Sequence, residues 1–149
     1  EEAFPNLNIK HDYNDRKVSQ NIAPFLVRYL KELSEGPNFY SDHKFVIEGV
    51  FIDFNKIMMN IDLNKYIVIG LTYSSLTEEE MYQNIKNYDT EDDWTYYCND
   101  EELKGNIKYF IENNKYFVDK FEEYNIKNFD ISENREKVVL EIIEYIKCN

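Results

Sequence analysis

Glycine is scarce in this sequence, with four residues in 149, and proline is scarcer still, with three. Enzymes that bind nucleotide phosphates through a glycine-rich loop need a Gly-x-x-x-x-Gly-Lys pattern, because its backbone N–H groups cradle the phosphates. No such pattern occurs here. The glycines stand alone at Gly36, Gly49, Gly70 and Gly105.

Cysteine and histidine are also rare. The two cysteines, Cys98 and Cys148, lie far apart and match no metal or redox spacing. The two histidines, His11 and His43, belong to no metal-like cluster. We therefore expect reduced thiols, a cytoplasmic location and no metal site made of these residues.

Basic residues are too few to balance the acids. The chain has 17 Lys and Arg against 29 Asp and Glu, a formal net charge of −12, which argues against nucleic acid or anionic lipid as a partner. Its apolar runs are too short to span a bilayer, and no signal peptide opens it. Apolar residues make up 43% of the chain, so we expect one folded domain over residues 1–149.

Helical spacing dominates what is present. Apolar residues recur at intervals of three and four from Asp15 to about Glu35, where Gly36-Pro37 stops the helix and Pro24 kinks or divides it. A short helix is expected at 55–59. Capping patterns begin two more helices, Thr77 with Glu80 and Asn99 with Glu102. Ser132 is the expected cap of a last helix, with an inward stripe at Val138, Val139, Ile142, Ile143 and Ile146.

Three segments are predicted as strands: 44–49, 66–72 and 126–131. The first two are almost continuously apolar, which is typical of strands covered on both faces. Strands that alternate with helices predict an α/β fold, a parallel β-sheet flanked by helices. Glu48 and Gly49 would then lie at the carboxyl end of a strand, where such sheets bind ligands.

Three stretches carry a family resemblance: VIEG at 46–49, YIVIGLTYSSLTEEEMYQNIKNYDTEDDW at 66–94 and FDISENREKV at 129–138. In this order and spacing they resemble P-loop kinase-like proteins, most closely bacterial proteins related to nucleotide kinases such as adenylate kinase. The resemblance spans about residues 1–147. It implies a P-loop nucleotide-kinase-like fold with a lid-like segment at about 88–100. It also implies ATP and magnesium as cofactors, and phosphoryl transfer to a nucleotide or another small hydroxyl-bearing acceptor.

The first βα unit of that family, which carries the phosphate loop, is missing from this sequence. In the family its strand lies between those resembling 45–49 and 66–72, so its absence predicts open strand edges. The chain begins with Glu1, not Met. We expect a larger protein cut or recorded without its N-terminal segment; a short, inactive relative stays open.

The resemblance and the residue chemistry together select candidate catalytic groups. Glu48 would position a magnesium-bound water or an acceptor hydroxyl, or would only accept structural hydrogen bonds. Gly49 would let a ligand approach closely, or would only make a turn. Lys86 would serve as a lid cation, because residues 29–134 contain no arginine.

Other candidates would bind substrate or nucleotide. Arg16 and Arg28 lie on the first helix, near the phosphoryl acceptor in such kinases, and Asp89 and Trp94 fall in the lid-like segment.

Two candidates follow the last strand, where the resemblance places the adenine base. These are Asn134 and Arg135. Arg135 opposes the dipole of the last helix, so it is either functional or paired with Glu133 or Glu136.

The leading hypothesis is thus a P-loop kinase-like phosphotransferase that is inactive as the sequence stands, because the phosphate cradle is missing. The alternative is a non-enzymatic acidic α/β interaction or regulatory module, such as a degenerate kinase. A homo-oligomer is compatible with both. An acidic mimic of nucleic acid is disfavoured, because the charges are dispersed over helix faces.

Overall fold

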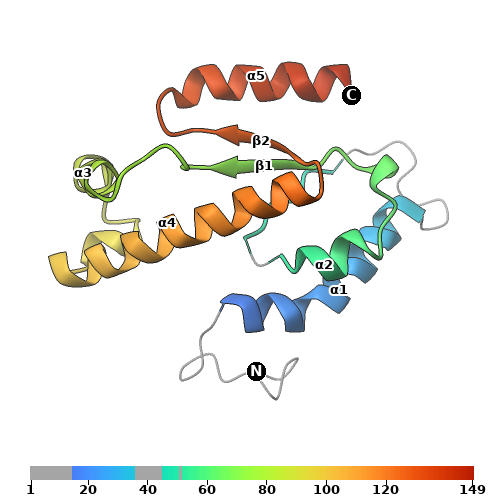
Figure 1. The fold of residues 1–149 in the computed structure, drawn as a ribbon, viewed down its shortest axis with the longest axis horizontal. Helices are drawn as coiled ribbons and strands as arrows, with labels where there is room; N and C mark the ends of the chain where they lie inside the picture. Colours follow the sequence, from blue (N-terminus) through green and yellow to red (C-terminus); the bar gives the residue numbers. More distant parts are fainter. Residues whose placement is uncertain (1–14, 36–44, 51) are drawn as a thin grey trace. The chain divides into compact units, whose positions relative to one another are not determined.

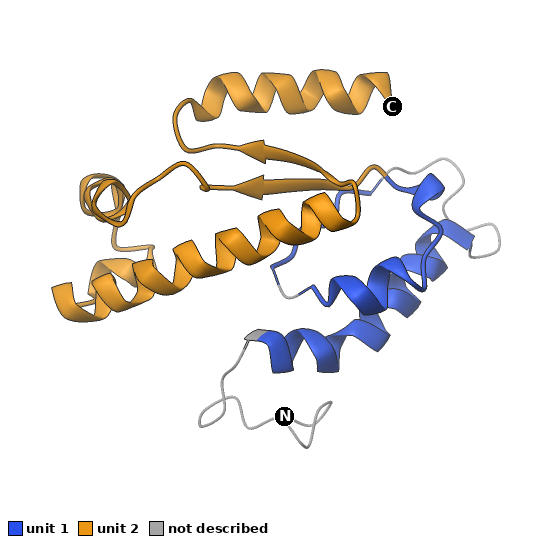
Figure 2. Cartoon of the chain, viewed as in Figure 1, with its two compact units in different colours: residues 1–66 blue, residues 67–149 orange. Residues whose placement is uncertain are grey.

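The computed structural model describes residues 15–35, 45–50 and 52–149, which belong to two compact units, 1–66 and 67–149 (Figure 2). His11, His43, Lys44 and the expected helix stop at Gly36-Pro37 lie outside the described residues. Each unit is considered by itself.

The first unit is built on helix α1 (Asp15–Glu35), which packs against the short helix α2 (Phe54–Met58). Helix α1 continues through Pro24 as one helix, so Pro24 does not divide it. The Asp53 side chain caps α2 by accepting from the backbone N–H of Lys56 at 3.0 Å. The apolar residues buried in this unit come from both helices: Val18, Ala23, Leu30, Phe54 and Ile57.

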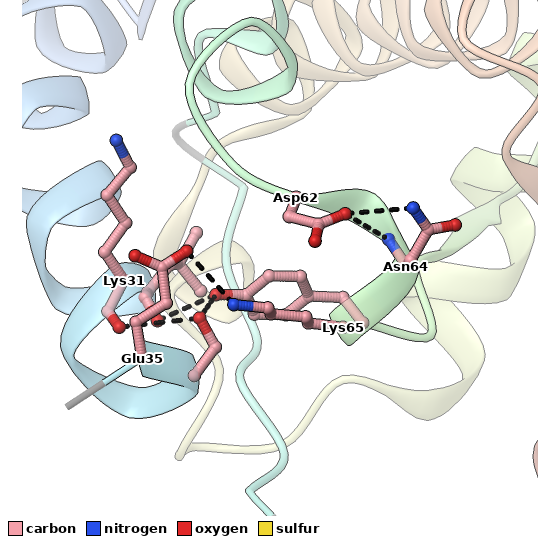
Figure 3. A network of polar contacts seen from close by, with 8 residues as sticks. Lys31, Glu35, Asp62, Asn64 and Lys65 are labelled. Atoms are coloured by element: carbon pink, nitrogen blue, oxygen red, sulfur yellow. Dashed lines mark hydrogen bonds and ion pairs between the residues drawn. The ribbon is translucent and has the colours of Figure 1, made fainter. Parts of the chain in front are cut away.

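A polar network ties the end of this unit back to α1 (Figure 3). The Lys65 ammonium lies 3.3 Å from the Glu35 carboxylate. The neighbouring Tyr66 hydroxyl donates to the Leu30 carbonyl at 2.7 Å and contacts the Ser34 hydroxyl at 2.8 Å. These bonds hold the 3-10 helix η1 (Leu63–Lys65) beside the last turns of α1.

The second unit contains a two-stranded parallel sheet. Strand β1 (Ile69–Thr72) pairs with β2 (Lys127–Asp130) in the register Ile69↔Lys127 to Thr72↔Asp130. Helices α3 (Glu78–Tyr88) and α4 (Asp100–Glu123) connect the two strands, with the 3-10 helix η2 (Trp94–Tyr97) between them. Helix α5 (Arg135–Cys148) follows β2. The expected mixed α/β architecture with a parallel sheet is therefore present.

The two faces of the sheet are covered unequally. Gly70 and Thr72 are buried on the face that packs against α4. On the other face Phe129 is buried and meets Tyr145 of α5 edge-on, with ring centroids 5.7 Å apart. Its cross-strand partner Leu71 stays 54% exposed, because α5 contacts mainly β2. Figure 1 shows α4 and α5 on opposite sides of the strand pair.

The apolar core of this unit lies between α3 and α4. Leu103 and Ile107 on α4 pack with Met81 on α3 and are almost fully buried. The capping boxes expected at Thr77–Glu80 and Asn99–Glu102 are both present, with each side chain bonded to the other residue's backbone. Local capping chemistry therefore sets where both core helices begin.

Three sequence-based predictions are wrong in whole or in part. Residues 45–49 form no strand and are exposed, with Val46 fully so, because they pair with no other strand in the described chain. Helix α5 is capped by Asn134, not Ser132, whose hydroxyl is bonded to Asp130. The expected inward stripe of α5 is at most half-buried, because α5 contacts mainly β2: Val138 and Ile142 are half-buried, and Val139, Ile143 and Ile146 are exposed.

Candidate functional site

The carboxyl ends of β1 and β2 meet in a cluster of hydroxyl groups around Asp130. One carboxylate oxygen of Asp130 accepts from the Ser74 hydroxyl at 2.7 Å and from the Ser75 hydroxyl at 2.5 Å. The other accepts from the hydroxyl of Ser132 and from its backbone N–H, the latter at 2.9 Å. We call Asp130, Ser74, Ser75 and Ser132 the serine–aspartate cluster.

The protonation state of Asp130 follows from these bonds. Partial burial raises the pKa of its carboxyl, but the hydrogen bonds from Ser132, Ser75 and Ser74 outweigh this and bring the pKa to about 2. Asp130 is therefore ionised near neutral pH. Because four donors already occupy its oxygens, its role is to gather the two strand ends and not to take up a proton.

Further polar contacts fix the loop after β1. The buried Thr72 hydroxyl bonds to the amide of Asn128 at 3.0 Å, and the backbone N–H of Tyr73 donates to Asn114 of α4 at 3.0 Å. The pairing continues past β2, where the Ile131 N–H donates to the Thr72 carbonyl at 2.8 Å. The loop is thus held before any ligand arrives, which lowers the entropic cost of binding.

Asn134 and Arg135 begin α5 next to this cluster in the chain. The Asn134 side-chain oxygen caps the helix by accepting from the Lys137 N–H at 2.9 Å, which leaves its amide N–H₂ group available. Arg135 is exposed and forms no ion pair with the described acids, Glu133 and Glu136 included. The salt bridge considered from sequence is therefore absent, and the helix start carries an available cation.

Lys86, the candidate lid cation, is held by an acid. Its ammonium lies 2.9 Å from Asp100 at the start of α4, and it lies 5.6 Å from the centre of the Tyr82 ring. The hydrogen bond with Asp100 raises the pKa of Lys86, and the hydrogen bond with Lys86 lowers the pKa of Asp100. The pair joins the two ends of the segment 89–99. Both side chains are exposed to solvent, so either partner of this ion pair can exchange it for another partner.

Asp89 and Trp94 lie in that segment. Asp89 is the C-cap residue of α3. Trp94 opens η2 and is 60% exposed, with its ring 6.0 Å from that of Phe110 in an edge-on contact. Neither lies in the serine–aspartate cluster.

The other candidates belong to the first unit. Arg16 and Arg28 are exposed on α1. Glu48 and Gly49 are exposed in the irregular segment 45–50, and a Cβ atom at Gly49 would meet no other atom within 4 Å. No close backbone contact therefore requires glycine at position 49 in the described chain. Their functional roles stay predictions.

Two wider features bear on the ligands of the site. The described residues contain no group of three or more His, Cys, Asp or Glu side chains arranged to hold a metal ion. None of the helices described here is long and apolar enough to cross a membrane.

Sequence reasoning missed the serine–aspartate cluster. Its signal is a hydroxyl-rich stretch, Thr72–Ser75, and an Asp-Ile-Ser stretch, Asp130–Ser132, each at the carboxyl end of a predicted parallel strand. Since the carboxyl ends of paired parallel strands lie at one edge of the sheet, the two stretches could have been predicted to meet.

Comparisons with protein-family models, curated proteins and solved structures find no match to this chain.

Proposed function

We propose that this chain provides the nucleotide- and acceptor-binding part of a P-loop kinase-like protein. In its intact form that protein transfers the γ-phosphate of ATP to a nucleotide or another small hydroxyl-bearing acceptor. The observation that carries the proposal is the parallel pairing of β1 and β2 across a helical connection. Ligands of parallel α/β sheets bind at the carboxyl ends of the strands. Here those ends carry the serine–aspartate cluster and lead to the start of α5.

Arg135 supports a phosphate-bearing ligand at this edge. Its guanidinium stands in the first turn of α5, where it forms no ion pair with the described acids and adds to the positive end of the helix dipole. A cation at this position costs helix stability unless an anion neutralises it. The phosphate of a nucleotide is such an anion, and the Asn134 amide next to it can donate to the base.

The uncovered side of β1 supports a further strand in the intact protein. Within the described residues β1 pairs only with β2. On the sheet face where α5 covers β2, Leu71 of β1 is 54% exposed. The resemblance places the strand that leads into the phosphate loop at this edge. A strand there would bury Leu71 and extend the apolar face under α5.

The chain's residues fit only part of the implied cofactor set. Hydroxyl groups, the Asn134 amide and Arg135 suit a nucleoside and one phosphate, but the described residues supply no glycine-rich cradle and no group of magnesium ligands. When bound, ATP with magnesium would supply the transferable phosphoryl group. We expect the acceptor to be bound by Arg16, Arg28, Gly49, Asp89 and Trp94. Glu48 and Lys86 are the proposed catalytic residues.

The first test is a titration of the ¹⁵N-labelled chain with Mg-ATP, in which NMR records the chemical shifts of the backbone amides. We expect saturable shifts at the loop 73–75 and at 131–135. The substitution Arg135→Gln should weaken binding by about tenfold, the effect of losing one charge-assisted contact. The matched control is Lys147→Gln at the other end of α5, which should leave the affinity unchanged. Shifts absent from both segments would refute nucleotide binding.

The second test concerns the phosphate cradle. The intact mass of the protein purified from its natural source should exceed the 18.0 kDa of this chain, with a Gly-x-x-x-x-Gly-Lys loop in the additional sequence. That protein should transfer labelled γ-phosphate, whereas the 149-residue chain should not. A natural protein of 18.0 kDa would favour the non-enzymatic alternative.

One observation favours that alternative, an acidic interaction or regulatory module. Helix α5 has no buried residue, and its apolar side chains Val139, Leu140, Ile143 and Ile146 are 41–64% exposed. An interaction module would cover them with a partner. Sedimentation of the intact protein would then show a defined assembly that does not respond to Mg-ATP, whereas a kinase should be stabilised by it.

A further inference from the structure

An exposed group of aromatic rings lies on the segment between α3 and α4, and none of these rings belongs to the serine–aspartate cluster. The rings stand within ten residues of one another and are 51–80% exposed: Tyr88, Trp94, Tyr96 and Tyr97. Large aromatic side chains dominate the energetics of interfaces when they are covered, so a concentration of uncovered rings indicates a contact surface. We call these four residues the aromatic surface.

Bonds within the segment hold this surface in shape. The Asp93 carboxylate accepts from the Thr90 backbone N–H at 3.0 Å and from its hydroxyl at 2.9 Å, and the Tyr97 hydroxyl donates to the Glu91 carbonyl at 3.0 Å. Trp94 meets Phe110 of α4 edge-on, and Cys98 packs against the core formed by Met81, Leu103 and Ile107. The rings are therefore presented by an ordered segment, which reduces the cost of ordering on binding.

The charged residues within the segment itself all have one sign. Residues 87–103 contain no lysine, arginine or histidine, and they contain seven acids: Asp89, Glu91, Asp92, Asp93, Asp100, Glu101 and Glu102. Asp93, Asp100 and Glu102 already have partners in Thr90, Lys86 and Asn99. Glu91, Asp92 and Glu101 are exposed and form no ion pair within the described chain. Such a surface attracts cations.

We propose that the aromatic surface and its carboxylates bind an arginine-rich segment of a partner protein. Arginine suits this surface better than lysine, because the planar guanidinium stacks on a ring face while its N–H groups bond to a carboxylate. The rings stand open to solvent, whereas sites for small molecules are concave. In a 3-10 helix, residues three apart lie on the same side, so Trp94 and Tyr97 can flank one guanidinium. The proposal does not rest on the kinase-like function.

Trp94 is the only tryptophan in the chain, so its fluorescence reports directly on this surface. The probe is a blocked peptide of alternating arginine and serine, with a lysine–serine peptide and spermine as comparisons. We expect the arginine peptide to change Trp94 emission saturably and to bind several-fold more tightly than the lysine peptide. Equal binding of the two peptides, or tighter binding of spermine, would overturn the proposal.

Variants locate the binding with labelled peptide and fluorescence anisotropy. Replacing the three unpaired acids (Glu91→Gln, Asp92→Asn, Glu101→Gln) should weaken binding by about tenfold, and Trp94→Leu by a similar factor. The control removes three charges from exposed positions on α4 (Glu112→Gln, Asp119→Asn, Glu122→Gln) and should change the affinity less than twofold. An equal loss in the control would show general electrostatic attraction and refute a site.

Self-association provides the remaining check. If a second copy of this chain covered the rings, Trp94 emission would shift to the blue as protein concentration rises without peptide, and the proposal would fail. We expect emission that does not depend on concentration. Failure of peptide binding would leave the Mg-ATP shifts at 131–135 unaffected, so the two proposals can be separated.

Discussion

The Asp130 carboxylate accepts the Ser75 hydroxyl at 2.5 Å across a separation of 55 residues in the chain. This bond joins the loop that follows β1 to the end of β2. The Ser74 and Ser132 hydroxyls bond to the same carboxylate, so the charged group of Asp130 holds together the segments at the carboxyl ends of both strands. The local stability of that edge should therefore depend on a single ionised side chain.

Replacing Asp130 tests this dependence. Asp130→Asn keeps the size of the side chain but removes the charge that strengthens the bonds from three serines. We expect a loss of about 1–2 kcal/mol in the free energy of unfolding, at the lower end for a half-buried group. Urea denaturation monitored by circular dichroism measures it. The control Asp119→Asn, on the exposed side of α4, should change stability by less than about 0.5 kcal/mol.

The same residue predicts a pH dependence. The pKa of Asp130 is about 2 in the folded protein, below the ordinary value of 3.8. A carboxyl whose folded pKa is depressed stabilises the fold above its unfolded pKa and loses that contribution as pH falls through the folded value. The stability difference between the natural protein and Asp130→Asn should be constant above about pH 5 and shrink from about pH 4 to about pH 2. A difference that stays constant over that range would contradict the assigned role.

Replacing Gly70 and Gly105 with alanine compares the effect of an added methyl group at a tightly packed position and at an open one. A Cβ atom at Gly70 would overlap the ring of Phe121, which is buried against the sheet. Gly70→Ala should therefore cost about 1–3 kcal/mol, because the ring must move. A Cβ atom at Gly105 would meet nothing within 4 Å, so Gly105→Ala in α4 should stabilise by about 0.5–1 kcal/mol. Thermal unfolding of both variants measures the opposite signs.

Asp100 is expected to control the ionisation of its neighbours. Its hydrogen bond is the main cause that raises the pKa of Tyr82 above 10.0, and it also raises the pKa of Lys86. Asp100→Asn should bring the pKa of Tyr82 back toward its ordinary value, as measured by NMR titration of labelled tyrosine. Stability should change by less than about 1 kcal/mol, because exposed ion pairs contribute little. An unchanged Tyr82 titration would show that the bond does not persist in solution.

The helices could be predicted closely from the sequence. The first residues of α3 and α4 follow from capping boxes that each span four residues, Thr77–Glu80 and Asn99–Glu102, whose hydrogen bonds need no partner elsewhere in the chain. The parallel pairing of β1 with β2 was also predictable, because two strands that are joined by a helical connection run parallel when they lie in the same sheet. Glu48 and Lys86 were found as candidates, but their roles stay predictions.

Tertiary structure decided what depends on distant partners. The apolar run at 45–49 reads locally as a strand, yet no described strand pairs with it, because a strand exists only with a neighbour to take its hydrogen bonds. Val139, Ile143 and Ile146 of the apolar stripe of α5 stay exposed, because two strands are too narrow to cover the whole stripe. The serine–aspartate cluster exists only once pairing brings residues 74–75 and 130–132 together. Local hydrogen bonding and apolar spacing are encoded over a few residues, whereas burial and site geometry depend on which segments meet.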